Sequence, residues 1–138
     1  MANHIERSRD GTILHLILAR LGKINALNAE MMMELATAVV ECATADTQLL
    51  VISGTGERGF CAGADIKEFL QGPRALEAQE RGLRAVISAL SQSPVPVLSL
   101  LHGRTMGAGV MIAALSDLVL RFGIGDQNVG WAGASGSE

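Results

Sequence analysis

The spacing of hydrophobic residues in the first third of the chain predicts a hairpin followed by a helix. Residues 5–9 and 12–19 are β-prone runs, and the Asp10-Gly11 dipeptide between them favours a tight turn. Residues 28–43 carry apolar side chains at helical spacing, with an asparagine in the capping position. A loop is expected between the hairpin and this helix.

Strand-like and helix-like segments then alternate along the rest of the chain. Short apolar runs bounded by turn residues suit buried strands, and longer amphipathic stretches suit helices that cover a sheet. The expected strands are residues 49–53, 95–101 and 118–121, and the expected helices are residues 65–70, 73–92 and 111–115. This order predicts an α/β fold with a largely parallel sheet.

The end of the sequence differs in kind from the part before it. Residues 122–138 contain five glycines and offer no apolar periodicity that would pack as a helix or a long strand. We therefore expect a core over residues 1–121 and an irregular tail over residues 122–138. A chain of 138 residues matches the size of one domain.

Composition excludes several classes of function. Net charge is −3 and aromatic residues are 3% of the chain, so neither a basic footprint nor a stacking platform for nucleic acid exists. Two cysteines provide neither a disulfide framework nor metal-ligand spacing. No apolar run approaches the roughly 20 residues that span a bilayer, and the polar start does not resemble a signal peptide. We expect a cytoplasmic protein with no membrane or metal partner.

Twice, a buried strand runs through glycine-rich sequence into the start of a helix. The first of these strand–turn–helix corners spans residues 51–67, and the second spans residues 97–110. The start of a helix has unpaired N–H groups and the positive end of the helix dipole, so each corner can hold an anion. Two such corners on neighbouring strands could direct two N–H groups at one oxygen, which is the geometry of an oxyanion hole.

These corners carry the motifs of a known family. The run Phe-Cys-Ala-Gly-Ala-Asp-Ile-Lys-Glu-Phe at residues 60–69 resembles a signature of the crotonase family, the enoyl-CoA hydratase/isomerase group. Residues 94–117 resemble its second signature, and Asn-Ala-Leu at residues 25–27 resembles the loop before its first long helix. The resemblance covers about residues 5–121 in the family's order, and it corresponds to the N-terminal half of the family pattern.

The resemblance implies a crotonase-like β-β-α spiral that stops before its C-terminal helical part, and a homo-oligomer, either a trimer or a hexamer. It also implies an acyl-CoA thioester as substrate, with no further cofactor. By motif, the N–H groups of Ala64 and Ala108 correspond to the oxyanion donors. The path of coenzyme A would follow Ala62, Gly63, Asp65, Ile66, Lys67 and Gly107, where Lys67 can meet a phosphate.

Two departures from the family pattern bear on the reaction. Met111 stands where the family's hydratases have their first glutamate, and a thioether can neither donate nor accept the proton. Asp126 stands near the second glutamate position, in a segment that lacks the family's proline. We therefore expect isomerase-, decarboxylase- or hydrolase-like enolate chemistry rather than hydration, with Asp126 as a candidate proton carrier. The alternative is an acyl-CoA-binding or interaction scaffold without catalysis.

Three features have simpler interpretations than a site of their own. Residues 54–59 fit the dinucleotide pattern G-x-G-x-x-G, but no long helix follows directly, which disfavours a Rossmann site. Cys61 is better explained as a small buried thiol than as a nucleophile. His102 is better explained by a structural hydrogen bond than by proton transfer.

Overall fold

The computed structural model describes residues 3–123, and its first elements are the antiparallel hairpin that the sequence predicts. Strand β1 (Ile5–Asp10) pairs with strand β2 (Ile13–Leu18). Gly11 has a φ of +64° in the connecting turn, a conformation that glycine adopts without steric cost. Buried and half-buried residues alternate along β2, so one of its faces belongs to the core.

Five strands form one sheet in the order β1-β2-β3-β5-β7, and every neighbouring pair after the hairpin is parallel. The other strands of this sheet are β3 (Leu49–Gly54), β5 (Val97–Leu101) and β7 (Leu118–Arg121). Parallel neighbours need a crossover connection, and each crossover here contains a helix. The expected α/β fold with a largely parallel sheet is therefore confirmed.

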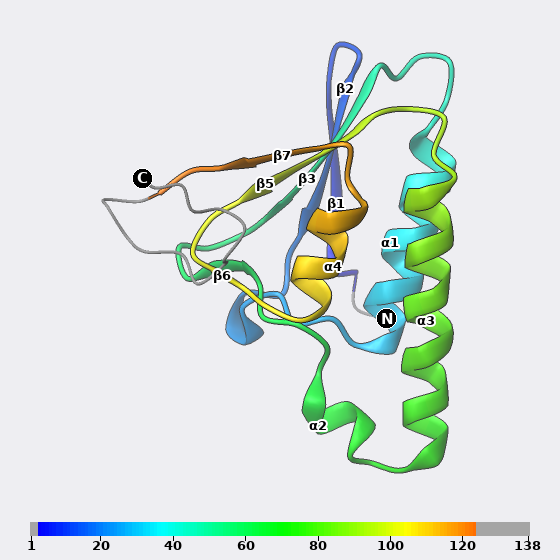
Figure 1. The fold of residues 1–138 in the computed structure, drawn as a ribbon, viewed down its shortest axis with the longest axis vertical. Coiled ribbons are helices and arrows are strands. Elements are labelled where there is room, and N and C mark those ends of the chain that lie inside the picture. Colours follow the sequence, from blue (N-terminus) through cyan, green and yellow to red (C-terminus); the bar gives the residue numbers. More distant parts are fainter. Residues whose placement is uncertain (1–2, 124–138) are drawn as a thin grey trace.

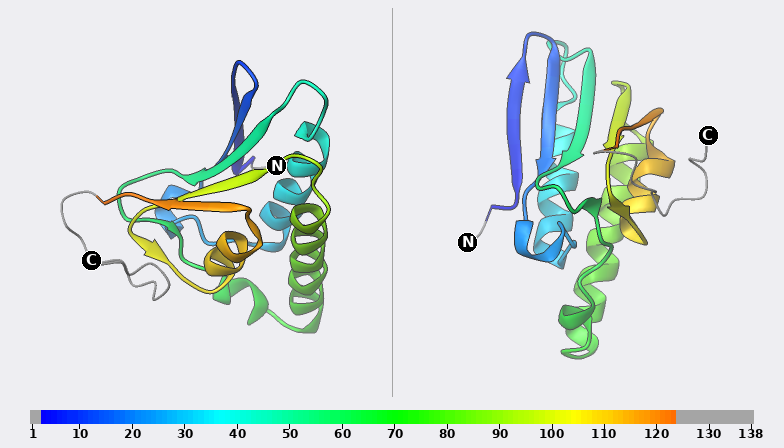
Figure 2. Two further views of the ribbon diagram at one scale, coloured as in Figure 1. Left: turned by 45° about the horizontal axis from the view of Figure 1, so that its top comes forward. Right: turned by 90° about the vertical axis from the view of Figure 1, so that its left-hand side faces the viewer.

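Two long helices cover one face of the sheet. Helix α1 (Ala29–Cys42) and helix α3 (Pro73–Ser91) run side by side and pack along each other (Figure 1, Figure 2). The Asn28 side chain caps α1, because its Oδ1 accepts the Met31 N–H at 2.7 Å. Both helices lie where the hydrophobic spacing predicts them.

A small second sheet lies where the sequence predicts only loops. Strands β4 (Gly59–Cys61) and β6 (Arg104–Thr105) pair in parallel, and they are too short to show an alternating pattern. Helix α4 (Ala108–Leu115) begins before the expected residue 111, directly after the turn at Gly107. The remaining elements are the short helix α2 (Ile66–Phe69) and the 3₁₀ turn η1 (Leu21–Lys23).

The tail predicted over residues 122–138 lies mostly outside the described residues. Phe122 continues beside β5, since its N–H donates to the Leu101 carbonyl at 2.9 Å. Its ring stacks on His102 with the centroids 5.3 Å apart. The domain boundary after residue 121 stays a prediction.

Asn25 fastens the loop before α1 to the end of β3 and to β4. It is fully buried and has a φ of +57°, a left-handed conformation that asparagine tolerates better than most residues. Its Nδ2 donates to the carbonyls of Thr55, Gly59 and Phe60 at 3.0 to 3.2 Å. Its Oδ1 accepts the Arg20 N–H at 2.8 Å, so one side chain joins three segments.

We predict that Asn25→Ala lowers the free energy of unfolding by about 3 kcal/mol, because each buried carbonyl left unpaired costs about 1–3 kcal/mol. Asn28→Ala is the matched control, since it removes only a helix cap and costs about 1 kcal/mol. Urea unfolding followed by circular dichroism measures both values. Equal losses in the two variants would contradict the joining role of Asn25.

Candidate functional site

The two strand–turn–helix corners predicted from sequence lie against each other. Strands β4 and β6 bring them together, and the Met106 N–H donates to the Cys61 carbonyl at 3.0 Å. A Cβ added to Gly63 would lie 3.4 Å from the Met106 carbonyl oxygen and 3.9 Å from the Ala108 nitrogen. Gly63 and Gly107 have φ values of +114° and +51°, so glycine suits both turns.

The backbone around Ala64 leaves its N–H free. Ala64 forms a parallel β-bridge with Leu27, whose N–H donates to the Gly63 carbonyl and whose carbonyl accepts the Asp65 N–H, both at 2.8 Å. A parallel bridge uses the residues on either side of Ala64, so the N–H of Ala64 itself points away from Leu27. Among residues 3–123, no group accepts that N–H.

The N–H of Ala108 is free for a different reason. Ala108 is the first residue of α4, and the first N–H groups of a helix have no partner within it. Gly107 precedes it without a side chain to cap the helix. Met111 and Gly109 donate to Gly107 and Met106, while the Ala108 N–H has no acceptor in the described part of the chain. Within residues 3–123, both predicted donors are therefore unpaired N–H groups, and they lie on segments in close contact.

The Asp65 side chain is engaged within the protein. Its Oδ2 lies 2.9 Å from Nη2 of Arg20, and its Oδ1 accepts the Glu68 N–H at 3.3 Å as the cap of α2. Burial alone would raise the pKa of the Asp65 carboxyl, but these hydrogen bonds and the charges of Arg20 and Lys23 outweigh it and lower the pKa. Asp65 is therefore ionised at neutral pH, and its partner Arg20 carries no local sequence signal that would have found it.

The other residues predicted to contact coenzyme A differ in their exposure to solvent. Ala62 is half-buried, and its N–H donates to the Ile24 carbonyl at 2.9 Å. Ile66 and Lys67 are exposed on α2, which extends from the body of the protein (Figure 1). Contact of these residues with coenzyme A stays a prediction.

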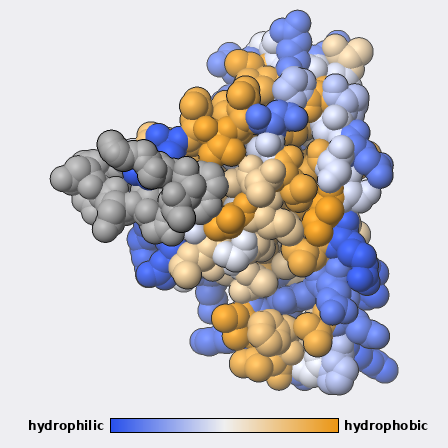
Figure 3. All heavy atoms as spheres, viewed as in Figure 1, coloured by the Kyte–Doolittle hydropathy of each residue, from blue (hydrophilic) through white to orange (hydrophobic). Residues whose placement is uncertain are grey.

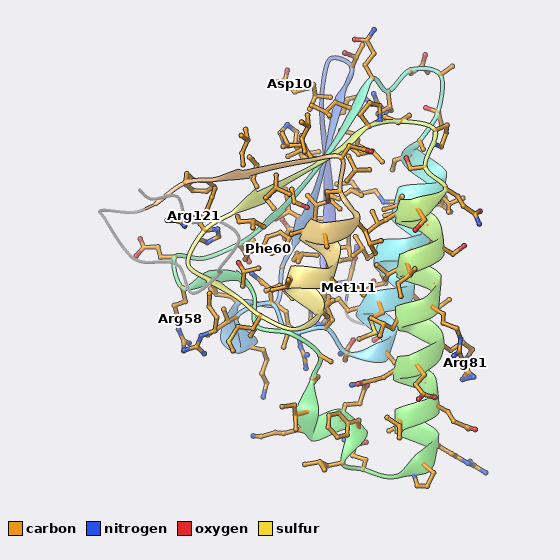
Figure 4. All side chains as sticks on the ribbon, viewed as in Figure 1. Asp10, Arg58, Phe60, Arg81, Met111 and Arg121 are labelled. Atoms are coloured by element: carbon orange, nitrogen blue, oxygen red, sulfur yellow. The ribbon has the colours of Figure 1, made fainter. Side chains whose placement is uncertain are left out.

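The candidate acid–base positions are only partly described. Met111 comes from α4 and is half-buried against the core (Figure 4), and Asp126 lies outside the described residues. The thiol of Cys61 is buried, which raises its pKa to about 11 despite a hydrogen bond to the Gly63 backbone. This pKa favours a packing role over a nucleophilic one. His102 Nε2 lies 2.6 Å from the Gly56 carbonyl, which is a structural hydrogen bond of the expected kind.

Other kinds of site receive no support in the described residues. Gly54 ends β3 and Gly59 begins β4, so the dinucleotide-like pattern joins two strands rather than a strand and a helix. Within residues 3–123, no three His, Cys, Asp or Glu side chains gather as metal ligands. No helix of that part has both the length and the apolar character to cross a membrane. Two surface hollows of about 1120 and 650 Å³ lie along α1, and no residue of the two corners lines either one.

Comparison with known proteins gives one consistent result. The family model described as enoyl-CoA hydratase/isomerase matches residues 13–120. A crotonyl-CoA hydratase from Syntrophomonas wolfei is 35% identical over 107 residues, which are 74% of this chain and 40% of that protein. The 1,2-epoxyphenylacetyl-CoA isomerase of Escherichia coli is 30% identical over 124 residues, or 86% of this chain and 45% of the relative.

Solved structures agree with the sequence relatives. An enoyl-CoA hydratase from Mycobacterium smegmatis superposes with a TM-score of 0.80 at 28% identity, covering 87% of this chain and 48% of that one. One from Bacillus anthracis gives a TM-score of 0.81 at 24% identity, covering 86% and 47%. The chain spans less than half the length of these proteins.

Proposed function

This chain belongs to the enoyl-CoA hydratase/isomerase family and has a crotonase-like fold, and on that premise we propose that it binds an acyl-CoA thioester. The N–H groups of Ala64 and Ala108 hold the thioester oxygen while it becomes an enolate oxygen. The observation that carries this proposal is a pair of N–H groups that have no acceptor in the described part of the chain and that lie on two corners in close contact. Each such donor contributes about 3 kcal/mol to a transition state that bears an oxyanion.

The proposed reaction is enolate chemistry without two-carboxylate hydration. Met111 occupies the position one helical turn after Ala108 and supplies no proton, so an isomerase-, decarboxylase- or hydrolase-like reaction suits the site better. Asp126 is the proposed proton carrier. The names of relatives include hydratases, isomerases and a hydrolase, so they support acyl-CoA chemistry as a class.

Met111 also favours a second candidate function. A chain that keeps both oxyanion donors without an acid–base partner can bind an acyl-CoA thioester and leave it unchanged. Such a protein would be a binding or interaction scaffold. The two candidates share the thioester site and differ in whether a proton moves.

Exposed apolar side chains support a further part of the proposal, assembly into a homo-oligomer, either a trimer or a hexamer. Leu118 and Leu120 of β7 are each 57% exposed, and Leu70 beside α2 is 71% exposed. Figure 3 shows hydrophobic residues gathered around β7 and α4, and again over α2. Apolar surface of this extent favours a protein partner. The cytoplasmic location stays a prediction.

We predict that Ala64→Pro weakens enolate stabilisation, because proline has no N–H to donate and only the Ala108 donor remains. Acetoacetyl-CoA is a suitable probe, since its enolate absorbs in the near ultraviolet and forms without help from a protein base. The bound enolate fraction should fall at least about tenfold, in line with the loss of one oxyanion donor. Affinity for free coenzyme A should change little.

Ala64→Gly is the control for this test, because it keeps the N–H and should keep the near-ultraviolet signal. Circular dichroism establishes that both variants are folded. A folded Ala64→Pro protein with the absorbance of the unchanged chain would refute the role of Ala64.

A second prediction separates the enzyme from the scaffold. If the rest of the site is competent, Met111→Glu should hydrate crotonyl-CoA, with a rate about 10²-fold above Met111→Gln, because a positioned acid–base group contributes about 10²–10⁴-fold. The decay of the enoyl thioester absorbance measures the rate. Equal rates in the Glu and Gln variants would favour the scaffold.

A further inference from the structure

We infer that Arg20 is a positioning residue for the Ala64 N–H, an inference that rests on the proposed function. Its guanidinium touches both sides of the bridge that holds Ala64 in place. Nη2 lies 2.9 Å from Oδ2 of Asp65, the residue after Ala64. Nη1 donates to the carbonyl of Ala26, the residue before Leu27, also at 2.9 Å.

These two contacts clamp the Leu27–Ala64 bridge from outside. Leu27 forms hydrogen bonds with the residues on either side of Ala64. Arg20 contacts the Ala26 carbonyl on one segment and the Asp65 carboxylate on the other. Because the guanidinium is planar and rigid, its two contacts fix the spacing between the segments. The direction of the free Ala64 N–H follows from that spacing.

The backbone of Arg20 is itself held in place, and its side chain is shielded from solvent. Its backbone N–H donates to Oδ1 of Asn25 at 2.8 Å, and its carbonyl accepts the N–H groups of Lys23 and Asn25 at 3.0 Å. The side chains of Arg20 and Asp65 are only 17% and 13% exposed. A pair this protected keeps its geometry better than a surface ion pair, which contributes little.

Gln79 of α3 adds a contact to the backbone of Asp65. Its Nε2 donates to the Asp65 carbonyl and to Oε1 of Glu68, both at 2.8 Å. The same Glu68 oxygen accepts the Ala29 N–H at the start of α1, also at 2.8 Å. Asp65 is thus fixed through its carboxylate, its N–H and its carbonyl, and a shift of about 1 Å at such a site can cost about 10²-fold in rate.

The test reads the thioester carbonyl directly. Crotonyl-CoA labelled with ¹³C at the carbonyl is bound to the protein, and isotope-edited infrared spectroscopy records its stretching band. Hydrogen bonds from Ala64 and Ala108 should move the band to lower wavenumber than in water. In Arg20→Met this displacement should shrink by about half, because one of the two donors is misplaced, while affinity for free coenzyme A stays within about twofold.

Two further variants make the result specific. Arg20→Lys keeps the positive charge but not the planar guanidinium with its two donors. The carbonyl band in this variant should therefore lie between the bands of the unchanged chain and of Arg20→Met. Arg7→Met is the matched control, because Arg7 pairs with Glu41 at 2.9 Å on the exposed surface and touches no residue of the corners. Its band should equal that of the unchanged chain.

If Arg20→Met folds and its band lies at the same wavenumber as that of the unchanged chain, the inference is wrong and the proposed function stands. If Arg20→Met does not fold, the test uses Arg20→Lys. A carbonyl band in Arg20→Lys at the same wavenumber as in the unchanged chain would also overturn the inference. If the unchanged chain itself shows no displacement, the proposed function fails, and the role of Arg20 fails with it.

Discussion

The backbone ladder between the loop over residues 20–27 and the segment over residues 59–65 is the constraint on which the site depends. Ala62 donates to Ile24, and Leu27 bonds the residues on either side of Ala64. Asn25 adds hydrogen bonds from its buried side chain to the same segment. Without this ladder, nothing in the backbone would fix the four residues between β4 and α2. With it, the Ala64 N–H is held in a fixed direction, and no group of residues 3–123 accepts it.

This arrangement lowers the stability of the fold locally and provides an N–H group that can bind a ligand. An N–H without a partner costs free energy when it is removed from water, and a conformation with positive φ costs more in any residue but glycine. The first cost falls on Ala64 and Ala108, which are half-buried and whose N–H groups have no acceptor within residues 3–123. Glycine at positions 63 and 107 avoids the second cost. The surrounding ladder and the Arg20–Asp65 pair offset the cost of the unpaired N–H groups. Local costs of this kind, held by an ordered surrounding, are typical of functional sites.

The sequence predicts features that depend on residues close together in the chain better than features that depend on residues far apart in it. The hairpin, α1 and α3 depend on local periodicity and capping, and their positions were predictable. The approach of the two corners was predictable too, because β3 and β5 are parallel neighbours whose carboxyl ends lie at one edge of the sheet. Strands β4 and β6 were not, since they are too short to carry a pattern. The partnership of Arg20 with Asp65 joins residues far apart in sequence, and neither residue marks the other.

The most direct measurement is an amide NMR titration of the ¹⁵N-labelled protein with crotonyl-CoA and, separately, with free coenzyme A. The account predicts that the amide proton signals of Ala64 and Ala108 move downfield with the thioester, because a carbonyl oxygen then accepts both N–H groups. Free coenzyme A, which has no such carbonyl, should leave these two signals nearly in place. Binding of crotonyl-CoA that moves other signals and leaves those of Ala64 and Ala108 unchanged would contradict the account.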